Sequence, residues 1–214
     1  MKAFGILPLI LLGAAPAMAQ ADAGSALAGG WEAAEGPDVA AQLVLRADGR
    51  FDYALAAGAL DERASGRWVR DGPFACLTTE PTPTPPQFVR QQAPADGPTV
   101  KVVWPNGRGI AGVDLRVGME GGAVVDGYTQ TDGWSLPADA TGNVAWIELV
   151  EPMHAISSPR FTLQASDHGR LMAVLQPNDL GVVDFRPACL EPDGKGGAVL
   201  HRAEGDFQFR RAED

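Results

Sequence analysis

The segment Gln42–Leu55, QLVLRADGRFDYAL, decides the fold class because it has the pattern of a β-hairpin. Apolar side chains occupy alternate positions on both sides of a central turn, at Leu43, Leu45, Phe51, Tyr53 and Leu55. The turn contains Asp48-Gly49, a dipeptide that accepts the positive φ angles of tight hairpin turns. We therefore expect two antiparallel strands here, each with one buried and one exposed face.

The same pattern continues along the chain. Further short alternating or apolar segments, separated by turn residues, are Glu62–Val69, Phe74–Thr79, Val100–Trp104, Val113–Val117, Ala123–Thr129, Val144–Val150, Phe161–Ala165, Leu171–Leu175, Val182–Phe185, Ala198–Arg202 and Phe207–Arg211. With 26 Gly and 17 Pro in 214 residues a helical bundle is excluded, whereas 45% hydrophobic residues suffice for a core. The sequence predicts an all-β protein.

Residues 1–19, MKAFGILPLILLGAAPAMA, have the features of a secretory signal peptide. Lys2 supplies the positive charge, Phe4–Leu12 is apolar but too short to span a bilayer, and Ala17-Met18-Ala19 matches a cleavage site. No cysteine follows the apolar run, so the sequence predicts no lipoprotein anchor. We expect a mature chain that begins at Gln20 and is periplasmic or secreted, with no membrane span.

The chain is acidic, with a formal net charge of −10 that becomes about −11 when Lys2 is removed with the leader. Negative charge repels phosphate backbones and anionic lipid surfaces, so we expect no nucleic-acid partner.

The two cysteines, Cys76 and Cys189, are an even number in an oxidising compartment, which favours a disulfide. Neither lies in a CxxC motif or near a histidine at metal-ligand spacing. The predicted bond would bring the first third of the chain next to the last.

The N-terminal block resembles bacterial lipocalin-like (calycin-type) β-barrel domains. The resemblance rests on Gly29-x-Trp31 at the start of the first strand, the DGRF run Asp48–Phe51, and Gly66-Arg67-Trp68. It implies that an arginine on the last strand stacks on the first-strand tryptophan. The candidates are Arg210, Arg211 and Arg202.

The middle of the chain is similar to carboxypeptidase-regulatory or transthyretin-like β-sandwiches. The matching residues are Ile110–Val117, Gly127-Tyr128-Thr129, Thr131-Asp132-Gly133 and Leu136-Pro137. Modules of this family bind partners or act as spacers and rarely catalyse, so the resemblance implies no catalytic residue.

Together the two resemblances predict an inserted-domain architecture. Residues 29–86 plus 171–211 would form the barrel, and residues 99–165 the sandwich. Pro81–Pro86 would be an extended spacer and residues 87–98 a linker. Two domains in tandem are the alternative, in which the disulfide would cross a domain interface.

The sequence contains no recognisable active site. The three histidines, His154, His168 and His201, stand alone, and no serine-nucleophile or phosphate-binding motif is present. The acidic pairs Asp61-Glu62 and Asp179/Asp184 would need a shared pocket to act as a hydrolase. We therefore predict no enzyme activity, no cofactor and no metal site.

Five tryptophans would serve as core residues or as a platform for a ligand, and Trp134 is the one expected to be exposed. The candidate ligand-binding residues of the barrel interior are Trp31, Phe51, Tyr53 and Trp68. The leading hypothesis is a binding or envelope-interaction protein for a small apolar ligand or a protein partner. It requires a barrel cavity of at least about 300 Å³. The alternatives are a structural module without a cavity and a carboxylate-based hydrolase.

Overall fold

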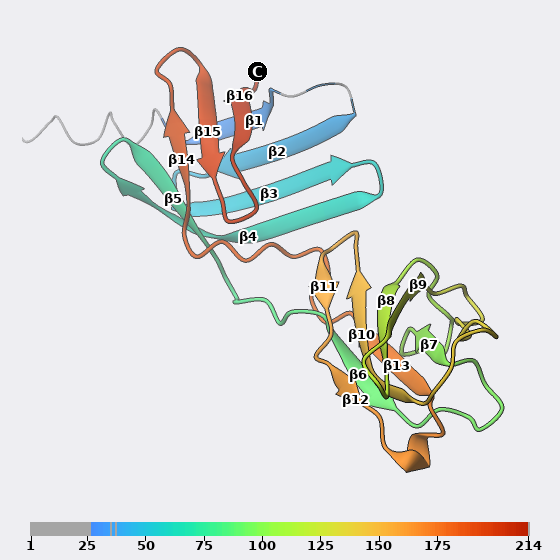
Figure 1. Ribbon diagram of the computed structural model, residues 1–214. Helices are drawn as coiled ribbons and strands as arrows, with labels where there is room; N and C mark the ends of the chain where they lie inside the picture. Colours follow the sequence, from blue (N-terminus) through green and yellow to red (C-terminus); the bar gives the residue numbers. More distant parts are fainter. Residues whose placement is uncertain (1–26, 35, 37, 214) are drawn as a thin grey trace, which may run out of the picture.

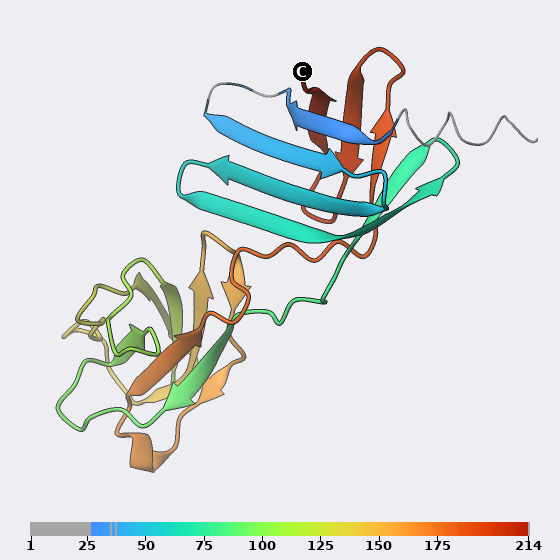
Figure 2. The same cartoon turned by 180° about the vertical axis from the view of Figure 1, so that it is seen from behind.

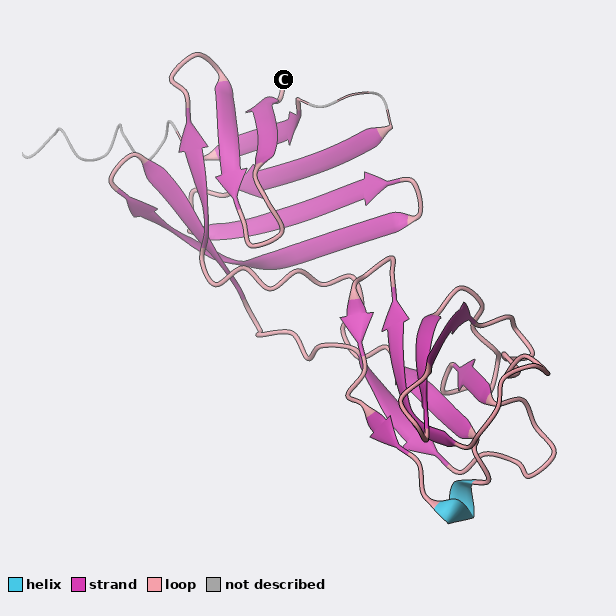
Figure 3. Cartoon of the chain, viewed as in Figure 1, coloured by secondary structure: helices cyan, strands magenta, loops and turns pink. Residues whose placement is uncertain are grey.

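The computed structural model describes residues 27–34, 36 and 38–213, and it confirms the all-β prediction (Figure 3). The only helical element among these residues is the 3₁₀ turn η1 (Ala165–Asp167). None of the described helical residues forms a segment long and apolar enough to cross a membrane. The predicted signal peptide, residues 1–19, lies outside the described residues.

Eight strands close into an antiparallel barrel in the order β1-β16-β15-β14-β5-β4-β3-β2 (Figure 1). Their bounds are β1 Gly29–Ala33, β2 Val39–Leu45, β3 Arg50–Ala57, β4 Leu60–Asp71, β5 Phe74–Thr79, β14 Ala188–Pro192, β15 Gly197–His201 and β16 Phe207–Arg211. The barrel therefore takes five strands from the start of the chain and three from its end. The predicted hairpin forms β2 and β3, and Gly49 at its turn has a φ of +82°.

The barrel encloses a core that follows from the alternation of the strands. On β3 the inward residues Phe51, Tyr53 and Leu55 are at most 5% exposed. They share one core cluster with equally buried residues of other barrel strands, namely Leu43, Leu45, Leu77, Leu190, Leu200 and Phe209.

The predicted disulfide is present and joins the two strands where the barrel is interrupted in sequence. Cys76 on β5 and Cys189 on β14 are direct cross-strand partners, 113 residues apart. All residues between these strands form the second unit and its two connecting segments. The bond therefore closes the barrel across the insertion.

The second unit consists of two sheets. One has the order β11-β10-β8-β9, with β12 also paired to β10, and the other has the order β6-β13-β7. Their bounds are β6 Gln87–Gln91, β7 Val100–Val103, β8 Asp114–Met119, β9 Val124–Tyr128, β10 Val144–Glu151, β11 Ile156–Ser157, β12 Phe161–Thr162 and β13 Leu171–Gln176. Residues of both sheets share one core cluster, including Val102, Leu115, Ile147 and Leu175. The unit is thus a β-sandwich with its own core.

Three assignments from the sequence need correction. Leu171–Leu175, expected in the barrel, belongs to β13, which pairs antiparallel with β6 and parallel with β7. Part of the expected linker, Gln87–Gln91, is β6. Val182–Phe185 forms no named strand; its one ladder contact is an isolated bridge between Val182 and Arg63.

Two segments connect the units and run side by side in both views (Figures 1 and 2). Asp179 N donates to Thr84 O (3.1 Å), and Asp179 Oδ2 accepts from Thr84 N (2.8 Å). Asn178 Nδ2 donates to Pro85 O (2.8 Å). These bonds join the outgoing segment, residues 80–86, to the return segment, residues 177–187.

Candidate functional site

The four residues predicted to line a barrel cavity lie together in the barrel core. Trp31, Phe51, Tyr53 and Trp68 belong to one buried cluster and are at most 9% exposed. The indole of Trp68 donates to Arg46 O (2.9 Å). Both tryptophans are therefore core residues, and their polar N–H groups are satisfied, as buried indoles require.

One end of the barrel is closed by Arg211, which stacks on Trp31. Its guanidinium carbon lies 4.7 Å from the Trp31 ring centroid, and the guanidinium donates to the carbonyl oxygens of Leu27 and Ala28. Trp31 Nε1 donates to Leu27 O (3.2 Å). Gly29 has a φ of +120°, and a Cβ there would lie 2.6 Å from Arg211 Nη2. This end therefore requires glycine at position 29, because a side chain would displace the stacked cation.

The opposite end is filled by Phe185 from the return segment. Its ring lies 5.2 Å from the Tyr53 ring and 6.0 Å from the Phe51 ring, and it is 2% exposed. Phe185 N donates to Thr79 Oγ1 (3.0 Å), and Thr79 Oγ1 donates to Val183 O (2.8 Å). Thr79 N donates to Phe185 O (3.1 Å). Phe185 is thus a fixed plug in the barrel interior.

A buried polar network borders this plug. Arg202 Nη1 donates to Glu62 Oε2 (2.7 Å) and to Tyr53 Oη (3.0 Å), and Tyr53 Oη donates to Glu62 Oε2 (3.1 Å). The side chains of Glu62 and Arg202 are only 14% and 12% exposed. Burial raises the pKa of Tyr53, so its hydroxyl remains protonated.

The described cavities open at the surface of the barrel rather than at its centre. A hollow of about 460 Å³ lies beside the connecting segments and touches Tyr53, and one of about 410 Å³ lies at the closed end and touches Trp31. Phe51 and Trp68 line neither of them. The barrel interior is packed with the side chains of the buried core cluster.

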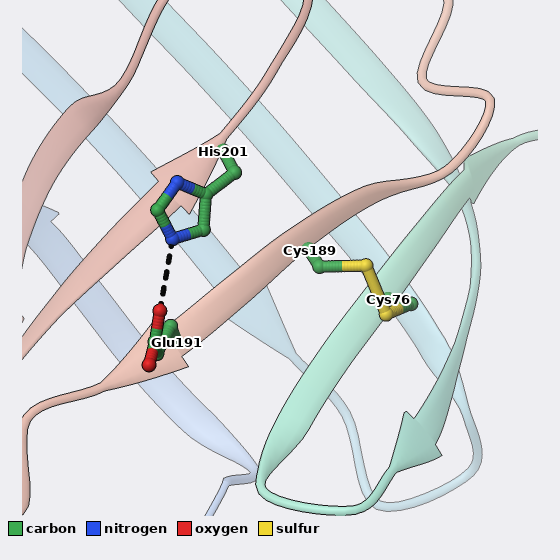
Figure 4. The surroundings of a disulfide bond; sticks show 4 residues. All are labelled: Cys76, Cys189, Glu191 and His201. Carbon is green, nitrogen blue, oxygen red and sulfur yellow. Dashed lines mark hydrogen bonds and ion pairs between the residues drawn. A yellow bond between two sulfur atoms is a disulfide. The ribbon is translucent and has the colours of Figure 1, made fainter.

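A charged cluster lies next to the disulfide on the outer face of the barrel. His201 is the cross-strand partner of Cys189 and lies beside Glu191 (Figure 4), with Asp206 at its other ring nitrogen. Its Nδ1 is 2.8 Å from Asp206 Oδ1, and its Nε2 is 3.0 Å from Glu191 Oε2. The hydrogen bond to Asp206 raises the pKa of His201 most, and the hydrogen bond to Glu191 raises it further.

Asp61 and Glu62 both border a surface hollow of about 430 Å³, but the side chains of the two acidic pairs have different partners. Asp61 and Glu62 are consecutive on β4, so Asp61 is exposed while Glu62 points inward to Arg202. Asp179 binds the backbone of the outgoing segment, and Asp184 pairs with Arg186. No group of three metal-ligating side chains occurs among the described residues.

Trp134, the tryptophan that we expected to be exposed, is half-buried, because its ring packs over Gly127 and against the sandwich core. Trp146 packs over Gly118 on the outer face of the sandwich. Arg160 covers it at 3.9 Å from the ring centroid. Neither ring is a free platform.

A hollow of about 530 Å³ lies at one end of the sandwich, where loops from both sheets meet. We call it the loop-end hollow. Its lining includes Thr99, Glu120, Leu136, Asn143, His168 and Arg170. From the sequence, His168 was considered as a site residue and Leu136 only as part of the sandwich resemblance, because the lining residues come from separate loops and share no motif.

Hydrogen bonds to the backbone and between side chains hold the polar side chains of the loop-end hollow in place. Arg170 Nε donates to Gly97 O (2.8 Å), and its Nη1 donates to His168 O (3.1 Å). Asn143 Nδ2 donates to Glu120 Oε2 (2.9 Å). Thr99 Oγ1 accepts from the backbone N–H of Leu136 (3.0 Å). The hollow therefore has a preformed polar rim, and the buried Leu163 contributes to its apolar part.

Comparisons with known proteins give no assignment: no protein-family model matches the chain, and no curated protein or solved structure matches it.

Proposed function

We propose that this chain is an exported, non-catalytic binding protein in which the barrel is a scaffold and the sandwich carries the ligand site. In this proposal residues 1–19 are a cleaved signal peptide and the mature chain acts in the periplasm or outside the cell. The barrel is lipocalin-like in its closed end, where Arg211 stacks on Trp31. The inserted unit is a transthyretin-like sandwich.

The loop-end hollow is the observation that carries the proposal. Its volume of about 530 Å³ is in the range of small-molecule sites, and its polar groups are held before any ligand arrives. Loops at the end of a rigid sandwich are a common location for binding sites. The filled barrel favours this hollow over the barrel interior, and its polar rim favours a polar ligand over an apolar one.

A structural module without a ligand is the second candidate, and a blocking substitution separates the two. Ala165 is exposed and lines the loop-end hollow, so Ala165→Trp adds a ring to it. Ala111 is an exposed alanine of the same unit outside the hollow, so Ala111→Trp is the matched control. Both variants should fold, which circular dichroism checks.

The experiment is native mass spectrometry of the protein purified from a periplasm, followed by thermal-shift screening of a panel of polar and apolar small molecules. We expect a small polar molecule to bind the wild type and Ala111→Trp, and to bind Ala165→Trp at least about tenfold more weakly. Equal binding by both variants, or no binding by the wild type, would overturn the proposal.

A further inference from the structure

We infer that the loop-end hollow binds a zwitterion, a small molecule that carries both an ammonium and a carboxylate group, as amino acids and short peptides do. This inference rests on the proposed function and specifies its ligand. It depends on the charges that face the hollow and on the hydrogen bonds that orient them.

The hollow contains one acidic and one basic side chain. Glu120 uses Oε2 to accept from Asn143, and Oε1 accepts no hydrogen bond from the described residues. Arg170 uses Nε and Nη1 for two backbone carbonyls, and within the described part of the chain its Nη2 donates to no acceptor. Neither side chain has an ion-pair partner among residues 27–34, 36 and 38–213. Each therefore has a remaining polar group for a ligand.

Neighbouring charged side chains do not neutralise Glu120 or Arg170. Asp167 is close in sequence to Arg170, but its carboxylate pairs with Arg90 on β6, and the hydrogen bond from Arg90 lowers the pKa of Asp167. The ion pair also anchors the loop that carries His168. His168 is exposed at the rim beside Arg170, where its ring can donate a second hydrogen bond to an anion.

These groups match the two ends of a zwitterion. A guanidinium held by carbonyls is a rigid donor for a carboxylate, and a free carboxylate oxygen is the usual acceptor for an ammonium group. Leu136, Val144 and Leu163 add apolar surface to the same lining, which suits an aliphatic side chain. The volume of about 530 Å³ leaves room for more than one amino-acid residue.

The test uses alanine and the peptides Ala-Ala and Ala-Ala-Ala as probes, with N-acetyl-Ala-Ala and Ala-Ala-amide as analogues that lack one charge each. Isothermal titration measures affinity, and amide shifts of Gly142 and Gly169, both in the lining, report the location. The three probe lengths distinguish a free amino acid from a short peptide as the source of the zwitterion.

We expect at least one zwitterionic probe to bind, and each single-charge analogue to bind about tenfold or more weakly. Glu120→Gln should weaken Ala-Ala but leave N-acetyl-Ala-Ala unchanged, because only the former presents an ammonium group. Arg170→Lys should weaken Ala-Ala but not Ala-Ala-amide. Asp126→Asn, an exposed carboxyl on β9 outside the hollow, is the matched control and should change nothing.

The outcomes separate this inference from the proposed function. If uncharged or singly charged molecules of the screening panel bind in the hollow and no zwitterion does, the ligand class is overturned while the binding function stands. If Glu120→Gln weakens both Ala-Ala and its acetylated analogue equally, the ammonium contact is overturned. If nothing binds the wild type, both proposals fail.

Discussion

Replacing both cysteines by alanine (Cys76→Ala/Cys189→Ala) will destabilise the barrel and leave the sandwich unchanged. The disulfide stabilises by limiting the conformational freedom of the unfolded chain, and the size of this effect depends on the length of the flexible loop it closes. A fully unfolded chain has a 113-residue loop between the two cysteines. The chain-entropy relation then gives about 4.8 kcal/mol.

The structure shortens this loop. Gln87 on β6 and Gln176 on β13 are direct cross-strand partners, so a folded sandwich holds its two ends next to each other. Only the segments from Cys76 to Gln87 and from Gln176 to Cys189 stay flexible, about 24 residues in all, and the same relation gives about 3.5 kcal/mol. Because the sandwich has its own core, we expect the smaller value.

The assay is urea unfolding followed by ¹⁹F NMR of protein labelled with 5-fluorotryptophan. Trp31 and Trp68 report on the barrel, and Trp104, Trp134 and Trp146 report on the sandwich. We expect the barrel resonances to lose about 3.5 kcal/mol of unfolding free energy in the variant, with the sandwich midpoint unchanged. Wild type in a reductant is the control and should behave as the variant does.

Two results would refute this reasoning. An unchanged urea midpoint of the barrel resonances would show that the disulfide does not restrict the conformational freedom of the unfolded chain. A single unfolding transition for all five resonances, with the free energy of unfolding lowered by about 4.8 kcal/mol, would show that the sandwich unfolds together with the barrel.

Three further substitutions test the barrel, each by urea unfolding. Arg211→Leu should cost about 2 kcal/mol, because it removes a stacked cation that also binds two carbonyls, whereas Arg210→Leu loses one exposed ion pair and should cost less than about 1 kcal/mol. Glu62→Gln should cost about 3 kcal/mol, because it removes the nearer counter-charge of a buried guanidinium and leaves only Glu204 at 4.0 Å; a cost below about 1 kcal/mol would contradict the network. Hydrogen bonds to Asp206 and Glu191 raise the pKa of His201, so its ion pairs stabilise the fold at low pH and this stabilisation is lost as pH rises through the folded pKa. Wild type should therefore lose stability relative to His201→Gln as pH rises above 6.5, the ordinary pKa of the side chain; a difference between the two proteins that does not change with pH would contradict the ion pairs.

The hairpins were predictable from the sequence because their signals are local. Asp48-Gly49 fixes a turn, and alternation on both sides fixes which residues face the core. Sheet membership is a long-range property, and the prediction was wrong for the strand that begins at Leu171. Leu171–Gln176 has a nearly continuous apolar pattern that indicates a buried strand but not which sheet contains it. Ala188–Pro192, a barrel strand, is short and ends in proline, so no pattern identified it.

Which arginine stacks on Trp31 also depends on long-range strand pairing, so the sequence alone could not decide it. The resemblance left Arg210, Arg211 and Arg202 as candidates. The structure selects Arg211 because it is the direct partner of Trp31 in the pairing of β1 with β16, while Arg210 points to the other face and pairs with Glu32. A shift of one residue in this register would exchange the two, and the register depends on the whole barrel.

The loop-end hollow could not be predicted for a related reason. Its polar residues come from loops at positions 99, 120, 143 and 168–170, which only the folding of both sheets brings together. No spacing rule connects Glu120 to Arg170. A motif search finds sites whose reactive residues are close in sequence, whereas the acidic and basic residues of this hollow, Glu120 and Arg170, are far apart in the chain.

The filled barrel also sets a quantitative limit on any ligand in its interior. Such a ligand would have to displace Phe185, which costs about 3 kcal/mol of lost burial. It would also break three hydrogen bonds between Thr79 and the return segment, at about 1 kcal/mol each. A penalty near 6 kcal/mol lowers an apparent affinity by roughly four orders of magnitude, so a ligand with an intrinsic micromolar affinity would bind only at about 10 mM. The loop-end hollow carries no such penalty, because its polar groups are already in place and no segment has to leave. A ligand therefore binds the exposed site in the sandwich at a lower free-energy cost than the barrel interior, which is accessible only after Phe185 is displaced.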